Sequence, residues 1–282
     1  MACRFPVGHN DRLEANPMNT LCGTLIFPAF LLAFSPSVLA DNCEWGHLSG
    51  RFLYDGEPPP AKVLPVPVSE RAKVGGKSVH DESLIVSEDG GVANIFIWLR
   101  PAIGVKPRTH PSYEASDQDA IELMARDLRL QPHALILRTS QTLRFRHADE
   151  RVGYNLKFNA FNNAPFCGLV SAGQTTGIHF GESERSPIDI SCNIHPWIHG
   201  RMLVLDHPYA AITDREGRFK IQNLPVGTWD FVALHEKSGY IKQPKVAGKQ
   251  VEWKRGTFQH EVTAGDNVLG DILIAAAEFQ RK

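Results

Sequence analysis

Short strand-like segments recur along most of this sequence, and they constrain its fold more than any other feature. Apolar or alternating runs of strand length are separated, about every 8–12 residues, by turn signals such as Asp89-Gly90-Gly91 and residues 214–217. The strand–helix–strand rhythm of a parallel α/β sheet is absent from the sequence. The pattern therefore predicts an all-β protein built from β-sandwiches.

The expected strands cover most of the chain after residue 50. Residues 92–99 form a nearly continuous apolar run, which predicts a strand buried on both faces. A single helix is expected at residues 117–126, where apolar residues follow a cap at Ser116 or Asp117. The other expected strands are 50–54, 83–86, 134–138, 142–147, 154–158, 175–180, 187–192, 201–206, 209–213, 218–221, 228–234, 257–262 and 270–275.

The charge balance excludes one class of partner. The 282 residues carry a formal net charge of -1, and 22% of them are charged. Without a basic excess there is no electrostatic basis for binding nucleic acid or an acidic membrane surface. We therefore expect no nucleic-acid partner. The length suits one large domain or two modest ones.

The first 40 residues have the pattern of a cleaved export signal. Residues 21–34 are mostly apolar, and Val38-Leu39-Ala40 supplies small residues at the usual cleavage spacing. We expect cleavage after Ala40, with Met18 as an alternative start; a leader that stays attached is the other interpretation. Because the apolar run is short for a membrane span, we expect a periplasmic or secreted protein with no stable span after cleavage.

Export to an oxidising compartment makes the cysteine count informative. The mature chain would keep Cys43, Cys167 and Cys192, an odd number that leaves at least one thiol outside any intramolecular disulfide set. If Cys192 is a metal ligand, Cys43 and Cys167 are the only pair left. The sequence leaves open whether they meet.

The segment Cys192-Asn193-Ile194-His195 places a thiol and an imidazole three residues apart, between two expected strands. Thiolate and imidazole together suit copper or zinc. Two ligands do not complete a site, so the alternative interpretation is a buried small thiol beside a loop imidazole that the fold alone maintains.

Several motifs resemble those of secreted bacterial cupredoxin-like proteins, often described as plastocyanin-like or methylamine-utilisation-like. The matching segments are residues 90–94 (Gly-Gly-x-Ala-Asn), 132–133 (Pro-His), 192–197 (Cys-x-Ile-His-Pro-Trp) and 206–209 (Asp-His-Pro-Tyr). Residues 217–227 (Gly-x-Phe-x-Ile-x-x-Leu-Pro-x-Gly) resemble the carboxypeptidase regulatory-like β-sandwich. The resemblance implies a cupredoxin-like Greek-key β-sandwich plus a small Ig/transthyretin-like β-sandwich.

These signals divide the chain into four expected parts. Residues 1–40 are the signal peptide or leader, and residues 41–90 are an N-terminal β extension. Residues 91–206 form the cupredoxin-like domain, and residues 207–282 form the carboxypeptidase regulatory-like β domain.

The resemblance implies a copper site with one Cys, two His and often a weak axial Met. Cys192 and His195 match the Cys and one His. The other His should immediately precede an Asn that braces the loop. Asn155 is present, but Tyr154 stands before it, and Ile198 stands at the Met position.

Three residues are candidates to complete the copper site: His147, His199 and Tyr154. Tyr154 would bind as a phenolate, which is costly at a pKa of about 10 unless the metal supplies charge. Each candidate also has a purely structural interpretation, as a packing aromatic or as an imidazole with no metal. Asn155 and Trp197 are expected beside the ligands, the second as an apolar lid. More distant imidazoles are those of His133 and His179.

We expect a non-enzymatic, exported copper-binding protein of electron-transfer type, with an incomplete type 1 site and a redox protein as partner. No catalytic residues are expected, because the sequence has no Gly-x-Ser-x-Gly motif and His235-Glu236 lacks the second His of a zinc-protease helix. The alternative is a metal-free module of the cell envelope that recognises a protein or glycan partner. The bound metal and the oligomeric state stay open.

Overall fold

The computed structural model describes residues 45–280. Nineteen strands, one short α-helix and three 3-10 helices make up this part of the chain. The prediction of an all-β fold is therefore confirmed. The expected leader at residues 1–40 and Cys43 lie outside the described residues. Within residues 45–280, no helix is long and apolar enough to cross a membrane.

Two β-sandwiches account for the strands. The first, here called the terminal sandwich, contains the first and last strands. Its core joins Leu48 and Phe52 of one sheet to Ile97 and Phe231 of the other. One sheet has the order β13 (Arg218–Pro225), β1 (Trp45–Asp55), β19 (Gly265–Ala275), β16 (Lys245–Val246) and β17 (Lys249–Gln250). The other has the order β12 (Ala210–Ile212), β2 (Phe96–Leu99), β14 (Gly227–His235) and β15 (Gly239–Tyr240), with β18 (Thr257–Val262) paired to β14.

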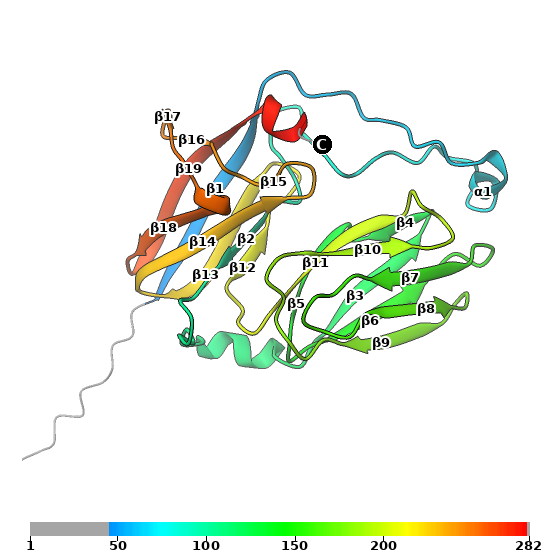
Figure 1. Ribbon diagram of the computed structural model, residues 1–282, viewed down its shortest axis with the longest axis horizontal. Coiled ribbons are helices and arrows are strands. Elements are labelled where there is room, and N and C mark those ends of the chain that lie inside the picture. The colour runs from blue at the N-terminus through cyan, green and yellow to red at the C-terminus, as the bar shows by residue number, and fades with distance from the viewer. Residues whose placement is uncertain (1–44, 281–282) are drawn as a thin grey trace, which may run out of the picture. The chain divides into compact units, whose positions relative to one another are not determined.

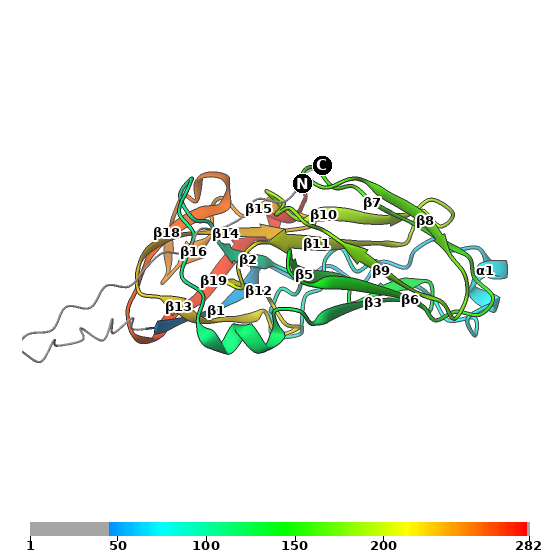
Figure 2. The ribbon, with the colours of Figure 1, turned by 90° about the horizontal axis from the view of Figure 1, so that it is seen from below.

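The second, here called the central sandwich, has a separate core in which Leu123 and Phe145 meet Leu156 and Ile190. One sheet has the order β5 (Ala134–Arg138), β11 (His199–Leu205), β10 (Ile188–Cys192), β7 (Tyr154–Phe158) and β8 (Phe166–Val170). The other has the order β4 (Arg129–Gln131), β3 (Ala120–Arg126), β6 (Thr142–His147) and β9 (Thr175–His179). Figure 2 shows the sheet with β3 and β6 below the sheet with β7 and β10.

Both sandwiches contain parallel as well as antiparallel strand pairs. β1 pairs with β19 in parallel, as do β5 with β11 and β3 with β6. Parallel neighbours cannot be joined by a tight hairpin, so the chain crosses between sheets to make them. These crossovers bring together residues that are far apart in the sequence.

β2 is buried on both faces, as its continuous apolar sequence predicts. All four of its residues are buried. Ile97 and Leu99 face the terminal core, while Phe96 and Trp98 pack with Leu203 of β11 in a third apolar cluster. This third cluster joins the terminal sandwich to the central sandwich.

The prediction of a helix at residues 117–126 is wrong. The chain forms a 3-10 helix, η1 (Pro111–Ser116), and then the strand β3. In β3 the fully buried side chains are Leu123 and Ala125, which are two residues apart, as strand geometry requires. Pairing with β6 on one side and β4 on the other supplies the backbone hydrogen bonds that a helix would have made internally.

The strand pairing differs from the expected domain boundaries. β1 and β2, which fall in the expected 41–90 and 91–206 parts, both pair with C-terminal strands of the terminal sandwich. Residues 56–90 connect them through α1 (Val68–Ala72) and are here called the strap. Figure 1 shows the strap running across to the far end of the central sandwich. There Val66 and Val79 enter the central core.

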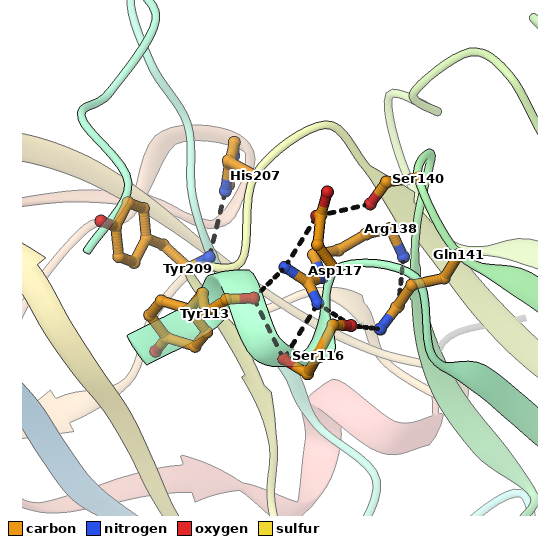
Figure 3. Close-up of polar contacts among 8 residues, drawn as sticks. All are labelled: Tyr113, Ser116, Asp117, Arg138, Ser140, Gln141, His207 and Tyr209. Atoms are coloured by element: carbon orange, nitrogen blue, oxygen red, sulfur yellow. Dashed lines mark hydrogen bonds and ion pairs between the residues drawn. The ribbon is translucent and has the colours of Figure 1, made fainter. Parts of the chain in front are cut away.

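A polar network attaches η1 to the turn between β5 and β6 (Figure 3). The guanidinium of Arg138 donates to the carbonyl oxygens of Tyr113 and Ser116 and lies 3.2 Å from Asp117 Oδ1. Ser140 Oγ donates to the same Asp117 oxygen at 2.7 Å. Since Arg138 is buried, these bonds satisfy a charge that would otherwise be costly in the interior.

Candidate metal centre

Cys192 ends β10, and His195 lies in the loop that leads to β11. Two backbone hydrogen bonds close this loop, from Cys192 N to Ile198 O at 3.1 Å and from Ile198 N to His195 O at 2.9 Å. The fold brings Cys192 Sγ to 3.8 Å from His195 Nδ1, and both residues are buried. The predicted thiol and imidazole therefore face each other.

The other ring nitrogen of His195 faces a carboxylate on the strap. His195 Nε2 lies 3.3 Å from Glu70 Oε2 in α1. A hydrogen bond from Lys73 lowers the pKa of Glu70, so this carboxylate is ionised at neutral pH. A carboxylate only accepts hydrogen bonds, so Nε2 carries the hydrogen and Nδ1 presents its lone pair to Cys192. Burial lowers the pKa of His195, against the effect of Glu70, which raises it.

Tyr154 occupies the space between two imidazoles. Its ring is fully buried and lies edge-on to His147 and His195, with centroid distances of 4.7 and 5.8 Å. Its hydroxyl donates to Asp149 Oδ2. Burial and this hydrogen bond raise the pKa of Tyr154 well above its ordinary value. The phenol therefore keeps its proton, and it acts here as a donor to Asp149.

His147 is buried at the end of β6 and has one free ring nitrogen. Its Nδ1 donates to the carbonyl oxygen of Val170 at 2.7 Å. Its Nε2 is buried and has no hydrogen-bond partner among the described residues. An unpaired nitrogen in the interior is energetically unfavourable, so His147 offers a buried lone pair next to the ring of Tyr154.

Asn155 and Trp197 both lie beside the Cys192–His195 loop. The backbone oxygen of Asn155 accepts from Asn193 N at 2.9 Å, and its side-chain Oδ1 accepts from the exposed thiol of Cys167 at 3.3 Å. The ring of Trp197 lies 5.1 Å from that of His195. Asn155 therefore braces the loop, and Trp197 packs on the imidazole.

His199 belongs to a different cluster. Its Nδ1 lies 3.7 Å from Glu236 Oε1, and His133 Nε2 lies 2.5 Å from Glu236 Oε2. Among residues 45–280, these three form the one group of His, Cys, Asp or Glu donors whose ligand atoms all lie within 4.8 Å of one another. The structure thus places His147 against Tyr154 and places His199 beside His133 and Glu236.

The sequence pattern does not predict a role for Glu70 or Glu236 at either site. Glu70 lies 125 positions before His195, and Glu236 lies 37 positions after His199. No local spacing connects either carboxylate to its histidine. The dipeptide His235-Glu236 is the only local pattern that indicates Glu236 as a possible ligand, and its spacing does not connect it to His133 or His199.

The Cys192–His195 pair fits a single metal ion. Metal bonds to sulfur and nitrogen are about 2.3 and 2.0 Å long. With Cys192 Sγ and His195 Nδ1 3.8 Å apart, these lengths give a sulfur–metal–nitrogen angle of about 120°. A trigonal type 1 site needs a second imidazole in the same plane. Cys192, His195 and His147 do not form a set of three donors within 4.8 Å, because Tyr154 lies between the histidines.

Comparison with known proteins gives only partial structural similarity. Neither the family models nor the curated proteins contain a match to this chain. A Cu(I) form of an amicyanin mutant is 19% identical over 30% of this chain and 81% of its own, with a TM-score of 0.27. A reduced Cu(I) form of another amicyanin mutant is 23% identical over the same shares, also with a TM-score of 0.27. A copper-containing nitrite reductase from Thermus scotoductus is 16% identical over 37% of this chain and 24% of its own, again at 0.27. The assignment of β-sandwiches therefore rests on the strand pairing and the separate cores.

Proposed function

We propose that this protein is a cupredoxin-type copper-binding protein in which Cys192 and His195 hold Cu(I). The observation that carries the proposal is the 3.8 Å separation of Cys192 Sγ and His195 Nδ1 in a buried loop. Thiolate is a soft ligand that favours Cu(I). A thiolate and an imidazole at this spacing reach one ion without moving the backbone.

Glu70 supports His195 as a ligand. In metal sites, the ligating histidine commonly donates its second ring hydrogen to a carboxylate, which fixes the ring orientation and raises its basicity. The Nε2–Glu70 contact of 3.3 Å gives His195 this arrangement. Because Glu70 belongs to the strap, we infer that the strap helps to hold the ion.

The donor set favours copper handling over a blue-copper electron shuttle. Tyr154, which keeps its proton, stands at the sequence position where the resemblance to cupredoxin-like proteins implies the second imidazole. His147 Nε2 is a further buried nitrogen without a partner among the described residues, and the ring of Tyr154 packs against its imidazole. We propose that the protein binds and passes on Cu(I) without bond-making chemistry, with a redox or copper-delivering protein as its partner.

The expected signal at residues 1–40 supports a periplasmic or secreted location for this activity. A second candidate function is a metal-free envelope module that binds a protein or a glycan. It is favoured by one observation, namely that the buried ring of Tyr154 fills the space between His147 and His195.

A competition titration tests the copper proposal. The chain from residue 41 onward, reduced and titrated with Cu(I) against a chromophoric chelator, should bind one equivalent at the Cys192–His195 pair. Cys192→Ser and His195→Asn should each lose this equivalent. Cys167→Ser changes an exposed thiol and should retain it. If Cys192→Ser binds Cu(I) as tightly as the unaltered chain, the copper proposal is wrong and the metal-free function is favoured.

A further inference from the structure

His133 and His199 come from neighbouring segments of the central sandwich. His133 directly precedes β5, and His199 is the first residue of β11, which pairs with β5. Arg201 N donates to the His133 carbonyl oxygen at 2.9 Å. A Cβ on Gly200 would lie only 2.8 Å from that oxygen, so glycine permits the close approach. The two rings lie 5.4 Å apart between centroids.

Glu236 reaches this pair from the other sandwich. It lies in the turn between β14 and β15 of the terminal sandwich. One carboxylate oxygen is 2.5 Å from His133 Nε2, and the other is 3.7 Å from His199 Nδ1. His199 Nδ1 is buried and has no hydrogen-bond partner among the described residues. A single carboxylate therefore faces a nitrogen of each imidazole.

Further charged groups lie close to these three residues. The opposite nitrogen of His133 lies 3.9 Å from Glu82 Oε2. Arg201 pairs with Asp189 at 2.6 Å, and its Nε also lies 3.7 Å from Glu236 Oε1, the oxygen that faces His199. A carboxylate behind a ligating imidazole is the usual outer partner of a metal site.

A small cavity adjoins the two imidazoles on the side of Glu82, and Glu236 does not line it. A cavity of about 10 Å³ is lined by His80, Glu82, Arg129, His133, Trp197 and His199, among other residues. This is about the space that one water molecule requires. Zinc sites with two histidines and one glutamate commonly keep water in the fourth position.

We propose that His133, His199 and Glu236 form a divalent-metal site that takes Zn²⁺ and ties the central sandwich to the terminal sandwich. Two imidazoles and a carboxylate, with an open fourth position, are a donor set that zinc prefers. The ion replaces the hydrogen bond between His133 Nε2 and Glu236. His133 changes tautomer, because its Nε2 proton passes to solvent and Nδ1, which faces Glu82, takes one up from solvent. The site shares no residue with the Cys192–His195 pair, so it stands independently of the proposed copper function.

Zinc titration of a Cys192→Ser/His195→Asn chain tests this proposal. These two substitutions remove the Cys192–His195 pair, so calorimetry measures binding at His133, His199 and Glu236 alone. We expect this chain to bind one equivalent of Zn²⁺. Co²⁺ in place of Zn²⁺ should give the visible absorption of a four-coordinate site. Added in this background, His199→Ala and Glu236→Gln should each weaken binding by at least about 100-fold, since outer partners alone are worth about 10–100-fold. His179→Ala, which alters an exposed histidine on β9, should leave binding unchanged.

A thermal measurement guards against variants that bind poorly because they are unfolded. Glu236→Gln keeps the shape of the side chain and a hydrogen-bond acceptor for His133, so it should fold. Zinc should raise the Tm of the Cys192→Ser/His195→Asn chain and leave that of the Glu236→Gln chain unchanged, because an ion stabilises only the state that binds it. The zinc proposal is wrong if Glu236→Gln leaves the zinc affinity unchanged, or if the folded Cys192→Ser/His195→Asn chain binds no zinc. Absence of Cu(I) binding by the unaltered chain would count only against the proposed copper site at Cys192 and His195.

Discussion

Tyr154 is the residue whose side chain decides how the proposed copper site is completed. The resemblance to cupredoxin-like proteins implies a histidine at this position. The phenol instead fills the space between His147 and His195 and donates to Asp149. Asp149 also accepts from the backbone of Asp127 at 3.0 Å. The carboxylate thus keeps a partner if the phenol is removed, which makes position 154 suitable for substitution.

Tyr154→His should restore a trigonal site. The new imidazole would join Cys192 and His195, and the chain should then bind Cu(II) with the intense visible absorption of a thiolate-bound type 1 centre. Tyr154→Phe, the matched control, should stay colourless and lose about 1 kcal/mol of stability with its hydroxyl hydrogen bond. Absorption spectra of the Cu(II)-loaded proteins measure the difference. If the Tyr154→His protein folds but stays colourless with Cu(II), residue 154 does not lie where it can join Cys192 and His195 at one ion.

At the scale of elements, the sequence predicts strands of two kinds. One kind buries a single face and alternates apolar with polar residues, and the other buries both faces and is continuously apolar. β2 is an example, since its apolar sequence alone indicates burial on both faces. The apolar residues of β3 cluster within 121–125, a pattern that also fits a helix. Only the pairing of β3 with β6 shows that its side chains alternate between the two faces of a sheet. The Cys192–His195 pair was predictable because its spacing is local. Glu70 and Glu236 were not, since tertiary packing alone brings each to its histidine.

The strap is predicted to control the copper affinity through α1. Glu70→Gln keeps the side chain's size but removes the charge that faces His195 Nε2. We expect a Cu(I) affinity about 10–100-fold lower, in line with the loss of an outer carboxylate. Glu88→Gln, on an exposed part of the strap, should leave the affinity unchanged. The same competition titration measures both, and equal affinities would show that α1 plays no part in the site.

Arg138 is predicted to anchor η1 to the central sandwich (Figure 3). Arg138→Met removes the donors to the carbonyl oxygens of Tyr113 and Ser116. We expect a loss of about 2 kcal/mol in the free energy of unfolding, measured by urea denaturation. Arg144→Met breaks an exposed pair with Glu122 and should change stability by less than about 0.5 kcal/mol. A similar small effect at Arg138 would mean that the network contributes little.

At the scale of the whole molecule, the central sandwich is inserted between β2 and β12 of the terminal sandwich. The existence of two sandwiches could be predicted from strand spacing and motifs. Their nesting could not, because the pairing of β1 with β19 connects segments about 220 residues apart. The return from β11 to β12 passes through Asp206-His207-Pro208, so this short connection carries the chain from one core to the other.

His207 in this connection should make folding sensitive to acid. Burial lowers the pKa of His207 from its ordinary 6.5, against Asp206 and a hydrogen bond with Leu99, which raise it. Arg100, Glu184 and Arg185 line the same cavity. Below pH 6.5 the unfolded chain takes up a proton that the folded chain refuses, so stability should fall as the pH falls.

The control for this pH effect is His207→Asn, whose side-chain oxygen can replace Nδ1 as the acceptor for Tyr209 N. Urea denaturation between pH 5 and 7, with a chelator present, measures the free energy of unfolding. The slope of that free energy against pH should be smaller in the variant. An unchanged slope would show that His207 contributes nothing to it.

The parallel pair β1–β19 also sets an order of events during synthesis. A ribosome releases residues 120–205 before it has made β19, so the central sandwich can complete its core while β1 still lacks its neighbour. Phe96 and Trp98 on the outer face of β2 pack on Leu203 and Leu205 of β11, so the central sandwich offers this early strand an apolar surface. The inserted sandwich thus serves as a scaffold on which the first and last parts of the polypeptide meet.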